Sequence, residues 1–397
     1  MISKRAQSIQ PSPTLSLAAK AKAMKAEGKD VVSLTVGEPD WNTFPGTVKA
    51  GVEAIQAGQT KYAPASGLPD LRKAIADDYN ANFGMTYEMA NTTVSAGAKF
   101  IIYSALMATI DPGDEVVFAA PYWVSYPEMI KLAEGIPVVL ETKESDGFKI
   151  TAEGLESSIN SRTKAVLLNS PSNPTGLAYS KEELQVIAGV LKNHPKLLVI
   201  SDDIYNLLYF KDRVAPHILE VAPELVDRTI CINGASKAYS MTGWRVGWAL
   251  GPKDIMAAMS KLQSQSVSCA PSFAQIASLH ALKNSEEEIA NSLDILSSRL
   301  EKAKALISKI DGVEFADPDG AFYLWIDIKS LFNKSYKAEK IVNSQRFSEI
   351  FLEDFLVASV PGNAFGMDGY LRFSYALAED RFEIGMNRLA ELVASLK

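Results

Sequence analysis

The stretch RTICINGASKAYSMTGWRVG, residues 228–247, joins an apolar run to two basic side chains. The apolar run 228–234 predicts a buried strand, and Lys237 follows it, with Arg245 eight residues later. A lysine amine that is partly removed from water loses charge and becomes a nucleophile toward carbonyl carbon. A guanidinium grips a phosphate with its planar fork. This stretch therefore predicts a chemical site at the end of a buried strand.

Similar apolar runs recur along the chain and alternate with helical stretches, which predicts an α/β fold with a mostly parallel central sheet flanked by helices. Helices are predicted over 98–110 and over 180–193, where Ser180 and Glu183 form a capping box. A second capping box, Ser285 with Glu288, is expected to open a helix over 285–310. The predicted strands are 114–120, 136–142, 164–170, 196–201, 228–234 and 246–251.

The chain of 397 residues is long enough for two domains. After the helix at 285–310, short strand-like runs and a last helix over 379–396 predict a smaller α+β domain. We expect an N-terminal arm and part of the small domain in 1–44, a large domain in 45–290, and the small C-terminal domain in 291–397.

Composition excludes several classes of protein. The net charge of −7 argues against nucleic acid as a partner. Two cysteines, Cys231 and Cys269, are too few for a disulfide framework, and the three histidines lack metal-binding spacing. No apolar run is long enough to cross a membrane, and no apolar segment accompanies the basic residues near the start. The cytoplasm is therefore the expected location.

Three polar clusters follow three of the predicted strands. They are NSPSNPTG (169–176), SDDIY (201–205) and GASKAY (234–239). Ligands of α/β proteins bind at the carboxyl ends of parallel strands, so these clusters are expected to meet in one crevice. A lysine close to a phosphate-binding arginine is the pair that pyridoxal phosphate requires.

The segment around Lys237 resembles the pyridoxal-phosphate attachment signature of the class I aminotransferases. The resemblance extends over nearly the whole chain and is closest to the bacterial-type aspartate aminotransferases. It implies the fold type I architecture of pyridoxal-phosphate-dependent transferases. The motifs that carry it, in family order, are LTVGEPD (34–40), TKYAP (60–64), DPGDEV (111–116), PYWVSYPEM (121–129), NSPSNPTG (169–176), SDDIY (201–205), MTGWRVG (241–247), GAFY (320–323), VPGNAFG (360–366) and LRFSYA (371–376).

The resemblance implies pyridoxal 5′-phosphate as cofactor, with Lys237 as its attachment point and as the base that moves the substrate α-proton. Asp202 would bind the pyridine nitrogen. Asp203 is the competing candidate, but the family's Asp-x-x-Tyr spacing favours Asp202. The other implied cofactor contacts are Tyr205 and Asn173 on the ring oxygen, Trp123 on the ring face, Arg245 and the start of the helix at Gly97, Ala98 and Lys99 on the phosphate, and Tyr62 on the phosphate of a neighbouring subunit in a homodimer. Many relatives carry glycine at the position of Ala98, where this chain has a methyl group next to the implied phosphate.

The same resemblance implies how a substrate would bind. Arg372 would grip the α-carboxylate, with Gly37, Trp123 and Asn173 around it. In this branch of the family Lys99, Ser12 and Thr14 are associated with the distal carboxylate of aspartate or glutamate.

The implied activity is ping-pong transfer of an amino group from L-aspartate to 2-oxoglutarate, giving oxaloacetate and L-glutamate. Relatives that also accept prephenate have a lysine where this chain has Gln10, which argues against prephenate. An aminotransferase for aromatic or other neutral amino acids is the alternative on the same scaffold.

Two other classes of protein fit this sequence less well. A regulator that senses the cofactor would carry a basic DNA-binding module, but only about 30 residues precede the first predicted strand. A dimerising scaffold without catalysis would not need Lys237 and Asp202 together.

Overall fold

The computed structural model describes residues 1–11 and 13–397. Its largest sheet has seven strands in the order β2-β8-β7-β6-β5-β3-β4. Only β8 runs against its neighbours, β2 and β7, so the sheet is mostly parallel, as predicted. The strands are β2 (Thr92–Ser95), β3 (Glu115–Ala119), β4 (Ile136–Leu140), β5 (Thr163–Asn169), β6 (Leu198–Asp202), β7 (Thr229–Gly234) and β8 (Gly247–Leu250).

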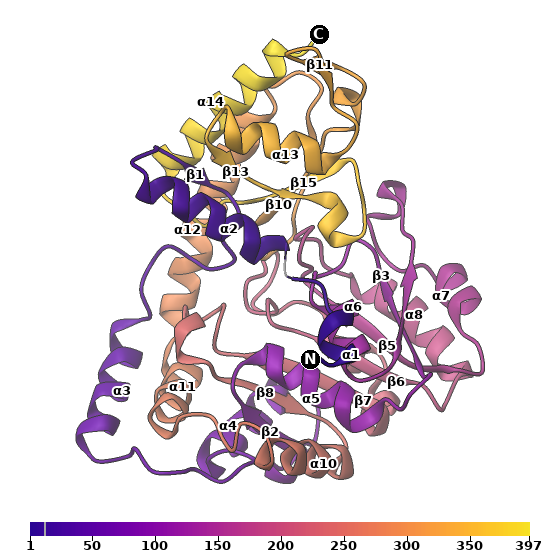
Figure 1. The fold of residues 1–397 in the computed structure, drawn as a ribbon. Helices are drawn as coiled ribbons and strands as arrows, with labels where there is room; N and C mark the ends of the chain where they lie inside the picture. Colours follow the sequence, from indigo (N-terminus) through magenta and orange to yellow (C-terminus); the bar gives the residue numbers. More distant parts are fainter. Residues whose placement is uncertain (12) are drawn as a thin grey trace.

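Apolar residues on both faces of the strands explain why this sheet is covered on both sides. Along β7, Cys231 belongs to one buried cluster, whereas Ile230 and Ile232 belong to another. Parallel strands need crossover connections, and helices provide them while covering the two faces (Figure 1). The helices between consecutive strands of this sheet are α5 (Ala98–Thr109), α6 (Tyr126–Leu132), α7 (Ala152–Ser158), α8 (Lys181–Asn193) and α9 (Ile218–Val221). Helices α3 (Pro45–Gln56) and α4 (Pro69–Phe83) precede the first strand, and α10 (Lys253–Ser264) and α11 (Ser272–Asn284) follow the last.

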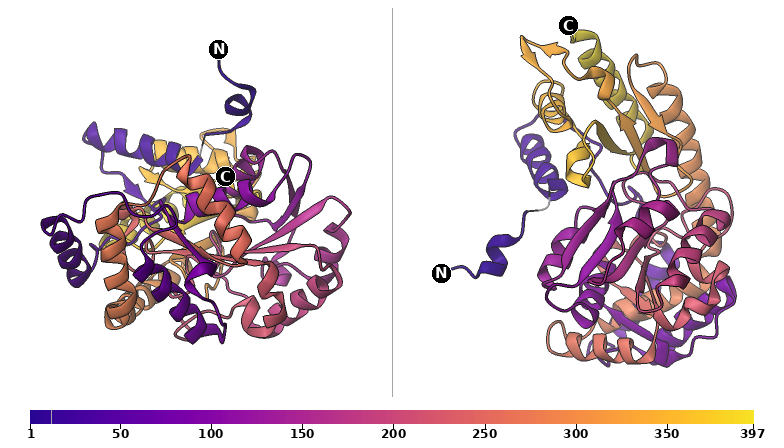
Figure 2. Two further views of the ribbon diagram at one scale, coloured as in Figure 1. Left: turned by 90° about the horizontal axis from the view of Figure 1, so that it is seen from below. Right: turned by 90° about the vertical axis from the view of Figure 1, so that its right-hand side faces the viewer.

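A second, antiparallel sheet has the order β14-β15-β10-β9 and lies beside the last three helices (Figures 1 and 2). Its central strands β10 and β15 pair along their whole length. The elements of this part are α12 (Glu286–Ile307), β9 (Glu314–Ala316), β10 (Tyr323–Asp327), β11 (Ser335–Tyr336), β12 (Glu339–Lys340), α13 (Ser344–Glu353), β13 (Val357–Ala358), β14 (Val360–Pro361), β15 (Tyr370–Ser374) and α14 (Glu379–Ser395).

The N-terminal segment packs against this second part of the molecule. Strand β1 (Val32–Ser33) pairs in parallel with β13, and helix α2 (Pro13–Ala26) lies against β13 and β14. Helix α1 (Lys4–Ser8) instead reaches the end of α6, where the Arg5 guanidinium pairs with Glu134. The remaining short elements are 3-10 turns at Met89–Asn91, Glu144–Asp146, Pro223–Arg228, Thr242–Trp244, Lys329–Leu331 and Gly362–Phe365.

The two predicted capping boxes have different outcomes. At α8 the Ser180 hydroxyl accepts from the Glu183 N–H, and the Glu183 carboxylate accepts from the Ser180 N–H, as predicted. At α12 the prediction was wrong, because the Ser285 side chain makes no cap bond. Its φ of −109° and ψ of 26° differ from the extended backbone that a capping serine needs. In the described part of the chain, no helix combines the length and apolar character required to cross a membrane.

Candidate active site

A cavity of about 700 Å³ lies over the carboxyl ends of β5, β6 and β7. In the sheet Asn169 pairs with Asp202, and Asp202 pairs with Ile232, so the ends of these strands lie side by side. The three polar clusters expected from the sequence therefore do meet. The predicted site residues that line the cavity are Thr14, Gly37, Ala98, Lys99, Trp123, Asn173, Asp202, Tyr205, Lys237, Arg245 and Arg372.

Lys237 is the amine at the centre of this cavity. It follows the fully buried strand β7, and its Nζ donates a hydrogen bond to the carbonyl oxygen of Gly37. Burial, partly offset by the charge of Glu38, lowers the pKa of Lys237 to about 8. Near neutral pH the residue therefore supplies the uncharged amine that nucleophilic attack requires far more often than a surface lysine does.

Asp202 ends strand β6 and is the carboxylate that faces the cavity. Tyr126 of α6 donates to its Oδ2 at 2.5 Å. Burial raises the pKa of Asp202 to about 7, although the Tyr126 hydrogen bond opposes the rise. A buried carboxylate of this kind pairs well with a protonated ring nitrogen.

A cradle for an anion lies where α5 begins. Gly97 precedes the helix with φ of +90°, and a Cβ there would come within 2.4 Å of Arg245 Nη2. The packing of Gly247 is equally close, because a Cβ would meet the Ala98 backbone nitrogen at 2.2 Å. The first N–H groups of a helix together with a guanidinium suit a phosphate.

Arg372 of β15 brings the second sheet into the cavity. Its Nη1 donates to Asn173 Oδ1 at 3.0 Å, and its Nη2 donates to the Thr35 carbonyl at 2.8 Å. The buried Nε of Arg372 has no hydrogen-bond partner in the described part of the chain. A buried arginine held in place with a spare donor is suited to a carboxylate ligand.

Aromatic groups complete the walls. The Lys99 ammonium lies 4.8 Å from the centre of the Trp123 ring, and burial lowers the pKa of Lys99. The hydroxyls of Tyr205 and Tyr323 share a hydrogen bond of 2.8 Å. The Tyr323 hydroxyl also packs against Gly37, where a Cβ would lie 3.4 Å from it.

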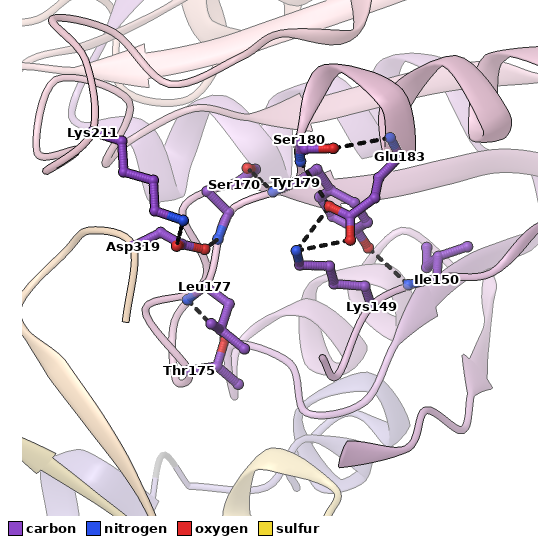
Figure 3. Close-up of polar contacts among 11 residues, drawn as sticks. Lys149, Ile150, Ser170, Thr175, Leu177, Tyr179, Ser180, Glu183, Lys211 and Asp319 are labelled. Carbon is purple, nitrogen blue, oxygen red and sulfur yellow. Dashed lines mark hydrogen bonds and ion pairs between the residues drawn. The ribbon is translucent and has the colours of Figure 1, made fainter. Parts of the chain in front are cut away.

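The turn that carries Asn173 is fixed by contacts from several loops (Figure 3). Tyr179 N–H donates to Ser170 Oγ at 3.1 Å. The Asp319 carboxylate accepts from the Ala178 N–H at 2.9 Å and also pairs with Lys211. Because Asp319 lies between β9 and β10, it ties the second sheet to this turn.

Among the predicted residues that the structure describes, Gly97 and Tyr62 do not line the cavity. Gly97 packs closely against Arg245, whose side chain does line the cavity. Tyr62 is 90% exposed and lies away from the cavity in a single chain. Ser12 lies outside the described residues. Gln10, at the position of the lysine discussed above, donates its backbone N–H to Glu128 at 3.0 Å.

Sequence reasoning missed several cavity residues. Tyr126 and Tyr323 lie within the motifs PYWVSYPEM and GAFY, but an aromatic residue in an apolar setting is usually part of the core. Lys22 and Lys25 of α2 also line the cavity, and no motif drew attention to them. The signal that could have found Tyr126 was its place close to Trp123 in the motif PYWVSYPEM, at the start of α6.

The fold and site define an α/β protein with a half-buried lysine at the carboxyl ends of its parallel strands. The pattern of the family "Aminotransferase class I and II" matches residues 29–389. The chain therefore belongs to the class I and II aminotransferases, a family that uses pyridoxal 5′-phosphate.

Individual relatives are similar over their full length. The chain is 42% identical to the aspartate/prephenate aminotransferase of Cereibacter sphaeroides, covering 98% of this chain and 97% of that protein. It is 41% identical to a probable aspartate/prephenate aminotransferase of Rickettsia felis, and the match covers 100% of this chain and 97% of that protein. Among solved structures, it resembles the aspartate aminotransferase of Rhizobium meliloti with a TM-score of 0.96, 39% identity and complete coverage of both chains. The aspartate aminotransferase of Thermus thermophilus with maleate has a TM-score of 0.92 and 36% identity, and the match covers 99% of both chains.

Proposed function

We propose that this protein is a pyridoxal-phosphate-dependent aspartate aminotransferase. It would transfer the amino group of L-aspartate to 2-oxoglutarate, giving oxaloacetate and L-glutamate. The observation that carries the proposal is the buried amine of Lys237 in one cavity with Asp202, Arg245 and Arg372.

The residues present fit the cofactor. Lys237 would hold it, Asp202 would bind its ring nitrogen, and Arg245 with the start of α5 would bind its phosphate. The cradle at Gly97 and Gly247, which a Cβ would fill, supports this assignment. Tyr205, Asn173 and Trp123 would surround the ring. When bound, pyridoxal phosphate supplies an electron sink for charge that develops at the substrate α-carbon.

The chain's own residues would perform the remaining steps. Arg372 would orient the substrate through its α-carboxylate, with the spare Nε donor as supporting evidence. The Lys237 amine would then remove the proton from the substrate Cα and, as the ammonium, deliver it to the cofactor carbon within the same half of the transfer, acting first as base and then as acid. The pKa of about 8 keeps this amine close to the balance between base and acid at neutral pH.

A basic side chain and a hydroxyl in the cavity lining support an acidic substrate. Lys99 and Thr14 line the cavity, as the distal-carboxylate assignment requires. The Thermus thermophilus relative has been solved with maleate, a dicarboxylate. Prephenate is the second candidate, because two of the relatives are named for both substrates. Gln10 in place of lysine favours aspartate.

We also propose a homodimer in which Tyr62 reaches the phosphate site of the neighbouring subunit. Its 90% exposure supports this role. The nearby helix α3 exposes Val52 and Ile55, which lie beside Trp244 and Phe273 in a surface hollow. An exposed apolar face of this kind is typical of an interface. The division into 1–44, 45–290 and 291–397 remains a proposal, and its last boundary would fall within α12.

A panel of single amino acids tests the function. Purified protein loaded with pyridoxal phosphate is mixed with aspartate, glutamate, phenylalanine or tyrosine, and loss of the cofactor's visible absorbance is followed. Prephenate is tested separately as the amino acceptor for protein already loaded with amino groups by glutamate. We expect aspartate and glutamate to react fastest. Faster reaction with phenylalanine or tyrosine would reject the aspartate assignment.

Substitution of the central lysine tests the mechanism. Lys237→Ala should lower transamination by about 1000-fold or more, because the proton-transfer group is lost. The matched control is Lys196→Ala, which removes an exposed lysine just before β6, at the opposite end of that strand from Asp202. Turnover unchanged by Lys237→Ala would reject the proposed mechanism.

A further inference from the structure

A second buried carboxylate lies directly behind the cavity, at the end of β6. Asp203 is 3% exposed and follows Asp202 in the sequence. Ser201 donates to its Oδ1 at 2.6 Å, and Tyr79 of α4 donates to its Oδ2 at 3.1 Å. Both oxygens of Asp203 therefore accept hydrogen bonds, which is the arrangement that suits a carboxylate anion. The proposed catalytic steps make no use of it.

His217 is the third group beside this anion. Its Nε2 lies 3.2 Å from Asp203 Oδ2, and the ring is 4% exposed. Its Nδ1 accepts the N–H of Leu219 at 3.1 Å. Since Nδ1 is an acceptor, the ring proton is assigned to Nε2, on the side of Asp203.

The same hydrogen bond distinguishes this cluster from a metal site. The ligand atoms of Asp203, His217 and Cys231 lie within 4.8 Å of one another. A histidine that binds a metal through one nitrogen normally donates the N–H of the other. His217 Nδ1 accepts instead, so the cluster is a polar pair rather than a metal-binding triad.

The charge of Asp203 is therefore not cancelled by a cation. Burial lowers the pKa of His217, whereas the Asp203 carboxylate raises it, and the net change is a rise to about 10. The geometry nevertheless favours the neutral ring, because the Leu219 N–H occupies the Nδ1 lone pair that a second proton would need. In the described ranges, Asp203 makes no ion pair with lysine or arginine. Its charge acts on the adjacent Asp202, where it adds to burial in raising the pKa.

We propose that Asp203, held by Ser201 and Tyr79 and lying beside His217, is a positioning residue that supplies negative charge behind Asp202 and so helps to retain the proton on the cofactor's ring nitrogen. The inference rests on the proposed function. The two neighbouring aspartates would then have different roles. Asp202 would contact the ring nitrogen, and Asp203 would set the electrostatic potential around that contact.

Other titratable groups around the pair do not change charge at neutral pH. Burial raises the pKa of the Cys231 thiol and of the tyrosine hydroxyls, which keeps them neutral. Lys237 is the remaining group that titrates in this range. The groups that face the two carboxylates are Tyr79 of α4, Tyr87 of the following loop, Tyr126 of α6, His217 beside α9, Cys231 of β7 and Lys237.

The test is a pH titration of the protein loaded with pyridoxal phosphate, in the absence of substrate. Asp203→Asn keeps the size of the side chain and removes its charge. We expect the midpoint of the cofactor's visible absorbance change to fall by about one pH unit, as expected for loss of a nearby buried charge. The cofactor dissociation constant at neutral pH should rise by about tenfold. His217→Gln should move the midpoint in the same direction by less.

His194→Gln is the matched control, because this histidine pairs with Glu156 near the surface and should leave the midpoint unchanged. If Asp203→Asn lowers only the melting temperature and leaves the midpoint unchanged, the role is structural and the inference is overturned. If that variant does not fold, Tyr79→Phe removes a single oxygen and should give a smaller downward shift; an unchanged midpoint would again overturn the inference. Absence of cofactor absorbance in the unsubstituted protein would instead overturn the proposed function.

Discussion

Lys237 illustrates how burial changes the chemistry of a single residue. Its amine lies in a cavity where water is limited, and desolvation lowers its pKa to about 8. The uncharged fraction therefore increases as the pH rises through this value. A surface lysine reaches the same state only near pH 10.

This difference predicts a pH dependence for cofactor attachment. With cofactor-free protein, the rate of pyridoxal phosphate binding should rise about tenfold per pH unit below pH 8 and then level off. The rate is followed by the visible absorbance of the bound cofactor after rapid mixing. A rate that continues to rise steeply up to pH 10 would show that Lys237 titrates as an ordinary lysine.

Gly97 predicts a second effect at the residue scale. Gly97→Ala places a methyl group against the Arg245 guanidinium, so we expect cofactor binding to weaken by tenfold or more, equivalent to about 1.4 kcal/mol. Gly28→Ala is a matched control, since Gly28 also has a positive φ of +86° but has open space around it. Both variants carry backbone strain of about 1–3 kcal/mol. Equal cofactor affinity in the two variants would contradict the cradle.

At the scale of elements, two serines at helix starts allow a direct comparison. Ser180 caps α8, whereas Ser285 precedes α12 without a cap bond, and its buried hydroxyl has no partner in the described part of the chain. Ser180→Ala should therefore cost about 1 kcal/mol of unfolding free energy. Ser285→Ala should be nearly neutral, because it removes an unsatisfied buried group.

Denaturant unfolding of both variants measures this difference. Local sequence contains a serine followed three residues later by glutamate at each site, which is why the same cap was predicted for both. The backbone at Ser285 is set by the end of α11, one residue earlier, and leaves the wrong angles for capping. A larger loss for Ser285→Ala than for Ser180→Ala would contradict the observed geometry.

At the scale of the whole molecule, the cavity is built from both sheets. Lys237 and Asp202 come from the large sheet, and Arg372 comes from β15 of the second sheet. Asp319 holds the two parts together at the turn near Asn173 (Figure 3). The residues proposed to orient the substrate and to attach the cofactor therefore come from different sheets of the fold.

The proposed dimer gives a prediction at this scale. The protein should have twice its chain mass of 43.1 kDa in solution. Val52→Lys, on the exposed face of α3, should favour the monomer and weaken cofactor binding, because charge at an apolar interface is costly. Light scattering after size exclusion gives the mass.

Val186→Lys is the control for that experiment, since Val186 is similarly exposed on α8, away from the α3 face. The Val186→Lys variant should remain a dimer. A monomeric unsubstituted protein would contradict the homodimer and the role given to Tyr62.

The sequence alone was enough to predict the α/β class, most strand positions and the family. Apolar runs mark strands buried on both faces, and the polar clusters after them mark the strand ends where a site forms. Lys237 could be singled out because a lysine directly after a buried strand is unusual. Asp202 and Arg372 were assigned through the resemblance to the aminotransferase family.

The tertiary structure decided what local sequence does not encode. It turned Asp202 toward the cavity and Asp203 toward His217, and it brought Tyr126 and Tyr323 beside residues far away in the chain. It also left Ser285 without its expected cap. The physical reason is that side-chain direction and proton affinity depend on neighbours packed from distant segments, whereas hydrophobic periodicity is a property of each segment alone.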